Sequence, residues 1–301
     1  ASGASFRRTP PTAAAFIPSP ADPSSSPARA GPRAGWDRRP SAPTGEVAAG
    51  FIAGLDGDGR WSIGWMDAES NALDWALASA PAVQPEAAWQ ADRLTDPSWY
   101  RDSGDVVQLW YSAGPGMGTR IGHARGLPPV AFDVAGDAAL TDGADGVVLA
   151  PSLDGFDSVA VFAPAVRRTA LPDEYRMYYA GHADAAAGPS DVPAGLGIGL
   201  AISKRADGDF VRTDRGIDGT ALVLAAGAPG DWDGGGVTAP AILREAGRWY
   251  LYYQGWDGTQ WQLGRAVSVD GFVFEKDPAN PLGPGVVGAD GQPARAFVSR
   301  P

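Results

Sequence analysis

A pattern of four short strands recurs along this chain of 301 residues and constrains its fold more than any other feature. The clearest copy runs from Trp232 to Lys276, where turn-forming residues separate four runs that suit β-strands. An aromatic residue followed by Asp opens this copy, and Pro240 comes seven residues after that Asp. One such sheet cannot bury both of its faces, so it requires neighbours of the same kind.

The same spacings occur in other parts of the chain. Seven residues separate the opening position from a Pro in Gln90–Pro97, Asp157–Pro164 and Asp233–Pro240. Thirteen residues separate an aromatic residue from an Ala in Trp65–Ala78, Tyr111–Ala124 and Tyr253–Ala266, and we interpret these pairs as marking the second and third strands of each copy. Repeats of roughly 50–75 residues with four strands each are typical of propeller blades.

The repeats predict an all-β fold, a five-bladed β-propeller of four-stranded antiparallel blades. We interpret residues 1–35 as an outer-strand remnant with a Pro/Ala/Ser-rich connector, and residues 36–301 as the propeller. The blades are expected near residues 36–88, 89–155, 156–231 and 232–289, with the fifth split between residues 290–301 and 1–8 or incomplete. Its two middle strands are missing from the sequence, so either this blade is abbreviated or the chain is part of a longer one.

Charge and composition exclude several classes of function. The formal net charge is −11 and the isoelectric point is near 4.6, which argues against nucleic acid or an anionic membrane as partner. No apolar run is long enough to span a bilayer, so we expect no membrane insertion. The absence of Cys excludes disulfides, thiolate metal sites and Cys nucleophiles. An acidic protein of this kind fits an extracellular or periplasmic location, and the sequence leaves its oligomeric state open.

The recurring motifs resemble those of a known superfamily. The pattern is an aromatic–Asp pair, a Pro seven residues later, a Tyr-x-Gly strand, Ile/Leu-Gly-x-Ala-x-Ser and Asp-Gly-x-x-Phe. It resembles the five-bladed β-propeller glycoside hydrolases, which include the arabinanase/xylosidase, invertase and levansucrase families, over most of residues 36–301. The resemblance implies carbohydrate as partner and an active site on the ring axis, where acids from different blades meet. One carboxyl group must donate a proton there while another attacks or activates water.

Asp96 is the first catalytic candidate, because the resemblance implies an Asp-Pro element and Asp96 precedes Pro97. The residue in the same place of the other repeats is expected to be Ala49, Ala163 or Ala239. The superfamily's general acid would be a Glu two residues before such a Pro, and no repeat has one. An Asp that caps a strand is the alternative reading of Asp96. A non-catalytic propeller that binds glycan or protein is the alternative function.

Asp157 is the second catalytic candidate. It recurs as Asp233 and Gln90 at the start of other repeats, so a structural role as acceptor for backbone N–H groups is the alternative. Trp99 and Trp256 are the candidates for stacking on sugar rings, and packing is the alternative for both. No metal site or cofactor is predicted. Structural Ca²⁺ near Asp184 and Asp191 is conceivable from the residue types, but no motif supports it.

Overall fold

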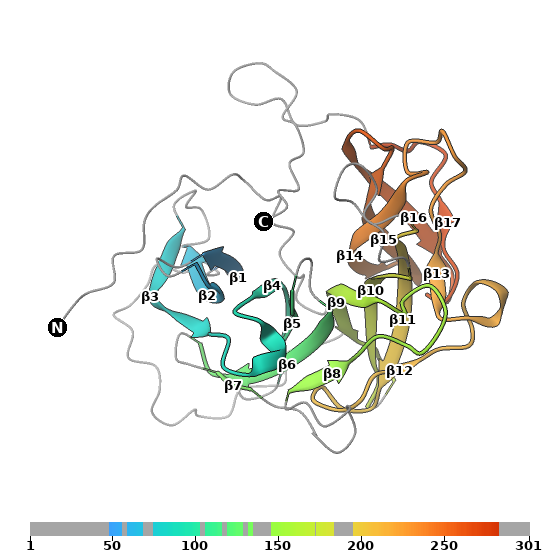
Figure 1. The fold of residues 1–301 in the computed structure, drawn as a ribbon. Coiled ribbons are helices and arrows are strands. Elements are labelled where there is room, and N and C mark those ends of the chain that lie inside the picture. Colours follow the sequence, from blue (N-terminus) through green and yellow to red (C-terminus); the bar gives the residue numbers. More distant parts are fainter. Residues whose placement is uncertain are drawn as a thin grey trace.

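Four antiparallel β-sheets make up the part of the chain that the computed structural model describes, which is residues 48–55, 59–68, 75–102, 106–115, 119–128, 132–134, 146–171, 173–183 and 195–282. The sheets follow one another around an arc (Figure 1). Within these residues there is no α-helix, and no helix that is long and apolar enough to cross a membrane. The prediction of an all-β fold with antiparallel sheets in a propeller-like arrangement is therefore confirmed. The segments 1–35 and 290–301 lie outside the described residues.

Sheet 1 consists of β1 (Ala48–Leu55), β2 (Trp61–Ala68) and β3 (Ala76–Val83). Sheet 2 consists of β4 (Leu94–Arg101), β5 (Val107–Ala113), β6 (Arg120–Gly126), β7 (Asp133–Val134) and β8 (Val147–Leu149). Sheet 3 consists of β9 (Ala160–Arg168), β10 (Tyr175–His182), β11 (Gly197–Ser203), β12 (Val211–Arg212) and β13 (Leu222–Leu224). Sheet 4 consists of β14 (Gly236–Glu245), β15 (Arg248–Trp256), β16 (Trp261–Ser268) and β17 (Glu275–Lys276). Two 3-10 turns, η1 (Ala88–Gln90) and η3 (Ile217–Gly219), connect strands.

The first strands of sheets 2, 3 and 4 lie at the centre of the arc. Each of them, β4, β9 and β14, forms the edge of its own sheet, and β9 contacts both of the others. The core lies between successive sheets and contains fully buried rings, among them Tyr111, Tyr179 and Tyr253. The start of each central strand bonds to the neighbouring sheet, as when the N–H of Val237 donates to the carbonyl of Leu196. These bonds bring the starts of the three central strands to the same face of the arc of sheets.

The fourth strand of sheets 2 and 3 is built in two pieces. β7 and β8 pair one after the other with the same edge of β6, and β12 and β13 do the same along β11. Sheet 1 has one continuous strand in this place, since β3 pairs with β2 over the whole of that edge. A chain excursion between the two pieces therefore leaves the sheet intact.

Sheet 1 corrects the predicted register of the first repeat. Its three strands were expected to be the first, second and third of a blade, but they correspond to the second, third and fourth strands of the other sheets. Ile63-Gly64 on β2 takes the place of Ile121-Gly122 on β6, because Ile63 pairs with Val83 as Ile121 pairs with Leu149. The carbonyl of Ala82 also accepts a hydrogen bond from the N–H of Phe132 in the next sheet, just as the carbonyl of Val148 accepts one from the N–H of Phe210. The strand equivalent to β4 would precede Ala48, outside the described residues.

The expected equivalence of Ala49 with Asp96 is therefore wrong. Ala49 lies on a second strand and pairs regularly with Asp67, whereas Asp96 lies at an irregularity of a first strand. Trp65, which was matched with Tyr111, lies instead on the third strand. The residue that faces Gly64 in the place of that Tyr is Ile52.

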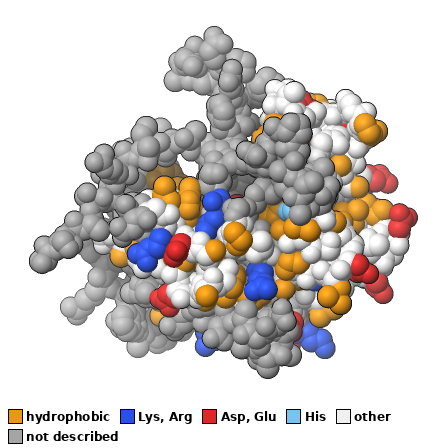
Figure 2. All heavy atoms as spheres, in the orientation of Figure 1, with side chains coloured by type: hydrophobic (Ala, Val, Ile, Leu, Met, Phe, Trp, Pro, Cys, Tyr) orange, Lys and Arg blue, Asp and Glu red, His pale blue; other side chains and the backbone are white. Residues whose placement is uncertain are grey.

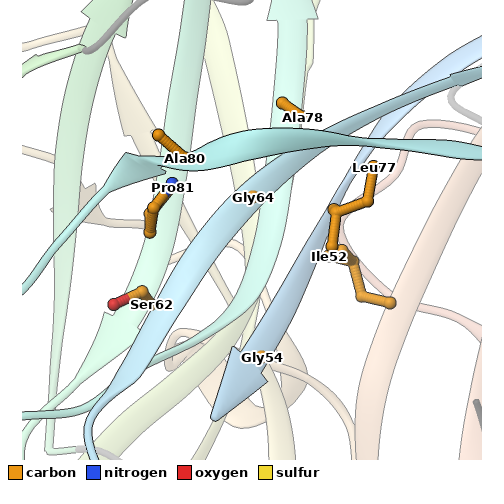
Figure 3. A pocket seen from close by; sticks show the side chains of 8 residues that line it. All are labelled: Ile52, Gly54, Ser62, Gly64, Leu77, Ala78, Ala80 and Pro81. Carbon is orange, nitrogen blue, oxygen red and sulfur yellow. The ribbon is translucent and has the colours of Figure 1, made fainter. Parts of the chain in front are cut away.

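A tyrosine and a glycine face each other in each of sheets 2, 3 and 4. Tyr111, Tyr179 and Tyr253 pair with Gly122, Gly199 and Gly264. A second aromatic ring lies against each of these tyrosines, namely Trp89, Phe156 and Trp232, with ring centroids 5.6–6.4 Å apart. Sheet 1 has Ile52 in place of the tyrosine, and a small hollow lined by Ile52, Gly64, Leu77 and Pro81 lies there (Figure 3).

Candidate functional site

A left-handed residue before a proline marks the central strand of sheets 2, 3 and 4. Asp96, Ala163 and Ala239 have φ angles of 51°, 49° and 47°, and the register of each central strand shifts at this point. Such an irregularity redirects a side chain away from the regular alternation of a strand. The three positions are therefore structurally equivalent, as the spacing to the Pro predicted, and Asp96 is the acid among them.

Two hydroxyl groups hold the carboxylate of Asp96. The Thr95 hydroxyl donates to Asp96 Oδ2 at 3.1 Å, and the Ser112 hydroxyl also donates to this carboxylate. Ser112 Oγ accepts in turn from the N–H of Ala163 at 2.7 Å. Since Thr95 and Ser112 are buried, Asp96 is fixed from below, while its own side chain is exposed. The carboxylate is therefore oriented and open to a ligand.

Desolvation by the surrounding protein raises the pKa of Asp96, and it outweighs the hydroxyl groups and the charge of Arg93, which lower it. Among the charged groups that the structure describes, Arg93 is the one whose charge acts on Asp96.

This raised pKa predicts that Asp96→Asn increases stability at neutral pH. Folding penalises the ionised form of Asp96, so at a pH above its folded-state pKa the charge lowers the free energy of unfolding. As the pH falls through that pKa towards the unfolded value of about 3.9, the wild-type carboxyl group takes up a proton and the advantage of the variant shrinks. Thermal unfolding of both proteins at a series of pH values measures this; a variant less stable than the wild type at pH 7 would contradict it.

Arg93 is a functional candidate that the sequence reasoning missed. It lies just before β4 and pairs with Trp61, as Gly236 pairs with Leu196, so sheet 4 has Gly236 where sheet 2 has Arg93. Its guanidinium lies over the Trp61 ring, 5.6 Å from the centroid, and its Nε is buried without a hydrogen-bond partner. The same comparison of equivalent positions that singled out Asp96 could have found Arg93.

Asp157 lies in a different environment, within the packed interior of sheet 3. It is 2% exposed and accepts from the hydroxyl groups of Ser152 at 2.6 Å and Tyr179 at 2.7 Å, and from Nε of Arg212 at 2.7 Å. The structure does not bring it together with Asp96, which belongs to another sheet.

The residues equivalent to Asp157 make the same kind of contact. Asp233 accepts from the Tyr253 hydroxyl at 3.1 Å and pairs with Lys276 at 2.7 Å. In sheet 2 the neutral Gln90 contacts the Tyr111 hydroxyl at 3.1 Å. Burial raises the pKa of all three tyrosines, which keeps their hydroxyl groups protonated. These shared contacts favour the structural alternative for Asp157.

The two tryptophans proposed to bind sugar differ in their surroundings. Trp99 packs between sheets 1 and 2, with its ring centroid 5.9 Å from that of Phe51 and 6.2 Å from that of Trp65. Trp256 ends β15 and lies 5.1 Å from Trp261 across the hairpin, and both rings are half-buried. This hairpin adjoins the start of β14, so it lies on the face of the arc where the central strands begin.

No group of three or more His, Asp or Glu side chains that could hold a metal ion occurs within the described residues. His123 is fully buried and its Nε2 lies 2.9 Å from Gln108 Oε1. His182 is also buried, beside the ring of Phe162. The loop that contains Asp184 and Asp191 lies outside the described residues.

Comparison with known proteins identifies the fold. No protein-family model and no curated protein matches the sequence. Solved structures that match include a thermostable family-43 glycoside hydrolase (15% identity, 79% of this chain and 74% of that chain, TM-score 0.50), a glycosyl hydrolase from Bacteroides ovatus (12%, 76% and 66%, 0.53) and the β-1,2-mannobiose phosphorylase from Listeria innocua (15%, 71% and 52%, 0.51). This chain therefore spans about half to three quarters of the length of these proteins. The resemblance to the propeller-type glycoside hydrolases is confirmed, and the chain shares their fold.

Proposed function

We propose that this protein binds an oligosaccharide or polysaccharide in the funnel at the centre of the sheets, with Asp96 as the principal polar contact. The observation that carries the proposal is the position of Asp96, an exposed and oriented acid at a backbone irregularity where the equivalent residues are Ala163 and Ala239. A carboxylate accepts hydrogen bonds from sugar hydroxyl groups, and charge-assisted bonds are the strong ones. Trp256 and Trp261, on the face of the arc where the central strands begin, supply ring faces for the sugar.

Binding without hydrolysis is the function that the described residues support best. Hydrolysis requires two carboxyl groups that flank the scissile bond, roughly 5–10 Å apart. Two residues before the proline, where the superfamily resemblance would place the general acid, the central strands have Thr95, Phe162 and Thr238. Phe162 is buried against the ring of His182 and has no proton to donate.

Glycoside hydrolysis is the second candidate, and the raised pKa of Asp96 favours it. A general acid must keep its proton near the working pH, and a raised pKa serves that role. The second carboxylate would then come from outside the described residues.

Asp96→Asn tests the binding function. Loss of a hydrogen bond to a charged group costs about 1.5–3 kcal/mol, so we expect saccharide affinity to fall roughly 10- to 100-fold. Asn keeps the size of the side chain and tolerates a left-handed backbone. A glycan array identifies a ligand, and calorimetric titration of both proteins then measures the change in Kd. Asp218→Asn is the matched control, because Asp218 is also exposed and left-handed, with φ 55°, but lies in η3 at the outer edge of sheet 3.

Unchanged affinity in Asp96→Asn contradicts the binding proposal at this site. Release of reducing ends from arabinan, xylan or fructan, abolished in Asp96→Asn, would instead establish the hydrolase. Binding that depends on Asp96 without any release of reducing ends supports the non-catalytic function.

We infer that a fifth sheet completes the ring between sheets 4 and 1. Sheet 1 has an apolar face opposite the one that packs on sheet 2, on which Ile52 is 38% and Leu77 50% exposed. In sheets 2, 3 and 4 the corresponding face is buried against the preceding sheet, as Tyr253 is in the core shared with sheet 3. An apolar face that lacks a neighbour within the described residues supports a further blade.

A further inference from the structure

Arg93 and Asp96 are the two charged residues that distinguish the central strand of sheet 2 from the other central strands. Three residues separate them, and the same places hold Ala160 and Ala163 in sheet 3 and Gly236 and Ala239 in sheet 4. The backbone of these places is alike, since Arg93 and Gly236 form the same parallel bridge to the preceding sheet. The fold itself therefore requires neither charge.

The guanidinium of Arg93 has no protein acceptor among the described residues. It is half-buried, its Nε is inaccessible and unpaired, and no ion pair joins it to Asp96, although the two charges act on each other. The other half-buried arginines beside acids do form such pairs, as Arg212 does with Asp157 at 2.7 Å. Arginine carries five N–H donors and no acceptor, and because the Nε of Arg93 is inaccessible, its two Nη groups are the donors left for a ligand.

A tryptophan ring lies against the guanidinium of Arg93. The Cζ of Arg93 lies 5.6 Å from the centroid of the Trp61 ring. Both residues lie on the face of the arc where the central strands begin, as do Trp256 and Trp261. Acidic side chains lie mainly along the outer edge of the face drawn in Figure 2, near β12–β17, and separate basic side chains lie nearer its middle. The whole protein has a formal net charge of −11, so an anionic ligand would need a local cation such as Arg93.

We propose that Arg93 is a binding residue for an oxyanion, so that the funnel takes a saccharide whose anionic group sits beside the sugar hydroxyl bound by Asp96. The guanidinium matches the two oxygens of a carboxylate or phosphate with two parallel hydrogen bonds, which its two Nη groups can donate. Two sources share this chemistry: the carboxylate of an acidic sugar, and free phosphate bound next to a neutral sugar. This inference rests on the proposed saccharide binding and specifies its class of ligand.

The test compares oligogalacturonate with neutral oligosaccharides of the same length, and measures inorganic phosphate both alone and together with the neutral set. Arg93→Gln removes the charge and the fork, and Arg93→Lys keeps the charge. Arg244→Gln is the matched control, because Arg244 also lies over a tryptophan, 5.5 Å from the centroid of Trp249, but at the far end of β14. Thermal unfolding of each variant shows whether it is folded.

We expect the wild type to bind the acidic oligosaccharide at least 10-fold more tightly than the neutral one. Arg93→Gln should abolish this preference, Arg93→Lys should retain part of it, and Arg244→Gln should retain all of it. Phosphate binding that is lost in Arg93→Gln supports the oxyanion site with phosphate as the source. Equal affinity for acidic and neutral saccharides, with no phosphate binding, overturns it.

The two proposals fail in different ways. Neutral saccharides that bind through Asp96, with Arg93→Gln unchanged on every ligand, leave the proposed function standing and remove the oxyanion site. Phosphate binding through Arg93, with no saccharide bound by any variant, leaves the oxyanion site standing and removes the proposed saccharide binding.

Discussion

Asp157→Ala is expected to lower the free energy of unfolding by about 3–5 kcal/mol, the usual effect of removing one partner of a buried ion pair. The carboxylate is the acceptor for Tyr179 and Arg212 inside sheet 3, and Ala would leave both donors without it. The measurement is equilibrium unfolding in urea, with m-values compared to show that the unfolded state is unchanged. Asp154→Ala, at an exposed position three residues away, should change stability by less than about 0.5 kcal/mol.

A double-mutant cycle separates a structural from a catalytic role for Asp157. Arg212→Gln should cost less in the Asp157→Asn background than in the wild type, because the neutral pair then resembles Gln90 with Tyr111 in sheet 2. A stable Asp157→Ala protein that has lost a saccharide-dependent activity would contradict the structural role. Additive effects of the two substitutions would show that the ion pair contributes little.

Gly199→Ala is expected to destabilise the protein by about 1–3 kcal/mol, the usual effect of overpacking a core. A Cβ at Gly199 would lie 2.5 Å from Cζ of Phe156 and 2.7 Å from Cζ of Tyr179, which is closer than atoms in contact can approach. Both rings are held by neighbouring side chains, so the sheet would have to move. Gly264→Ala should behave alike, since Trp232 and Tyr253 occupy the same places in sheet 4. Thermal and urea unfolding measure both variants.

Gly64→Ala is the internal control for this prediction. Gly64 occupies the same place in sheet 1, but Ile52 replaces the tyrosine there, and a Cβ would meet the flexible tip of Leu77 at 3.1 Å. We expect a change within about 1 kcal/mol, because the tip can rotate into the adjoining hollow. A loss as large as that of Gly199→Ala would show that backbone freedom, and not the tyrosine ring, requires glycine at this place.

Much of the fold could be predicted because the repeat fixes local structure and packing together. The strands around Tyr111, Tyr179 and Tyr253 lie where the spacings placed them, and the residues before Pro97, Pro164 and Pro240 are structurally equivalent. A strand that must present one face to each neighbouring sheet repeats its residues at the same intervals. Periodicity is therefore a reliable guide to sheets 2, 3 and 4.

The first repeat misled the prediction because its markers are degenerate. Ile52 stands where a tyrosine marks the second strand elsewhere, and Trp65 on the next strand was the nearest aromatic residue. The Ile63-Gly64 pair would have given the correct register, because glycine is required opposite the tyrosine in the other sheets. Arg93 could have been found by comparing equivalent positions, since Ala160 and Gly236 occupy its place in sheets 3 and 4, but only the structure shows that its Nε is unpaired.

The left-handed residue before each proline has a consequence for how this fold acquires new chemistry. For Ala163 and Ala239, holding this conformation costs roughly 1–2 kcal/mol each, yet neither has a polar side chain to use it. The fold therefore keeps a left-handed position in each central strand, and at two of these positions the side chain is only a methyl group. One codon change from Ala to Asp places a carboxylate at such a position without rebuilding the backbone, so activities can be gained or lost on this ring by single substitutions.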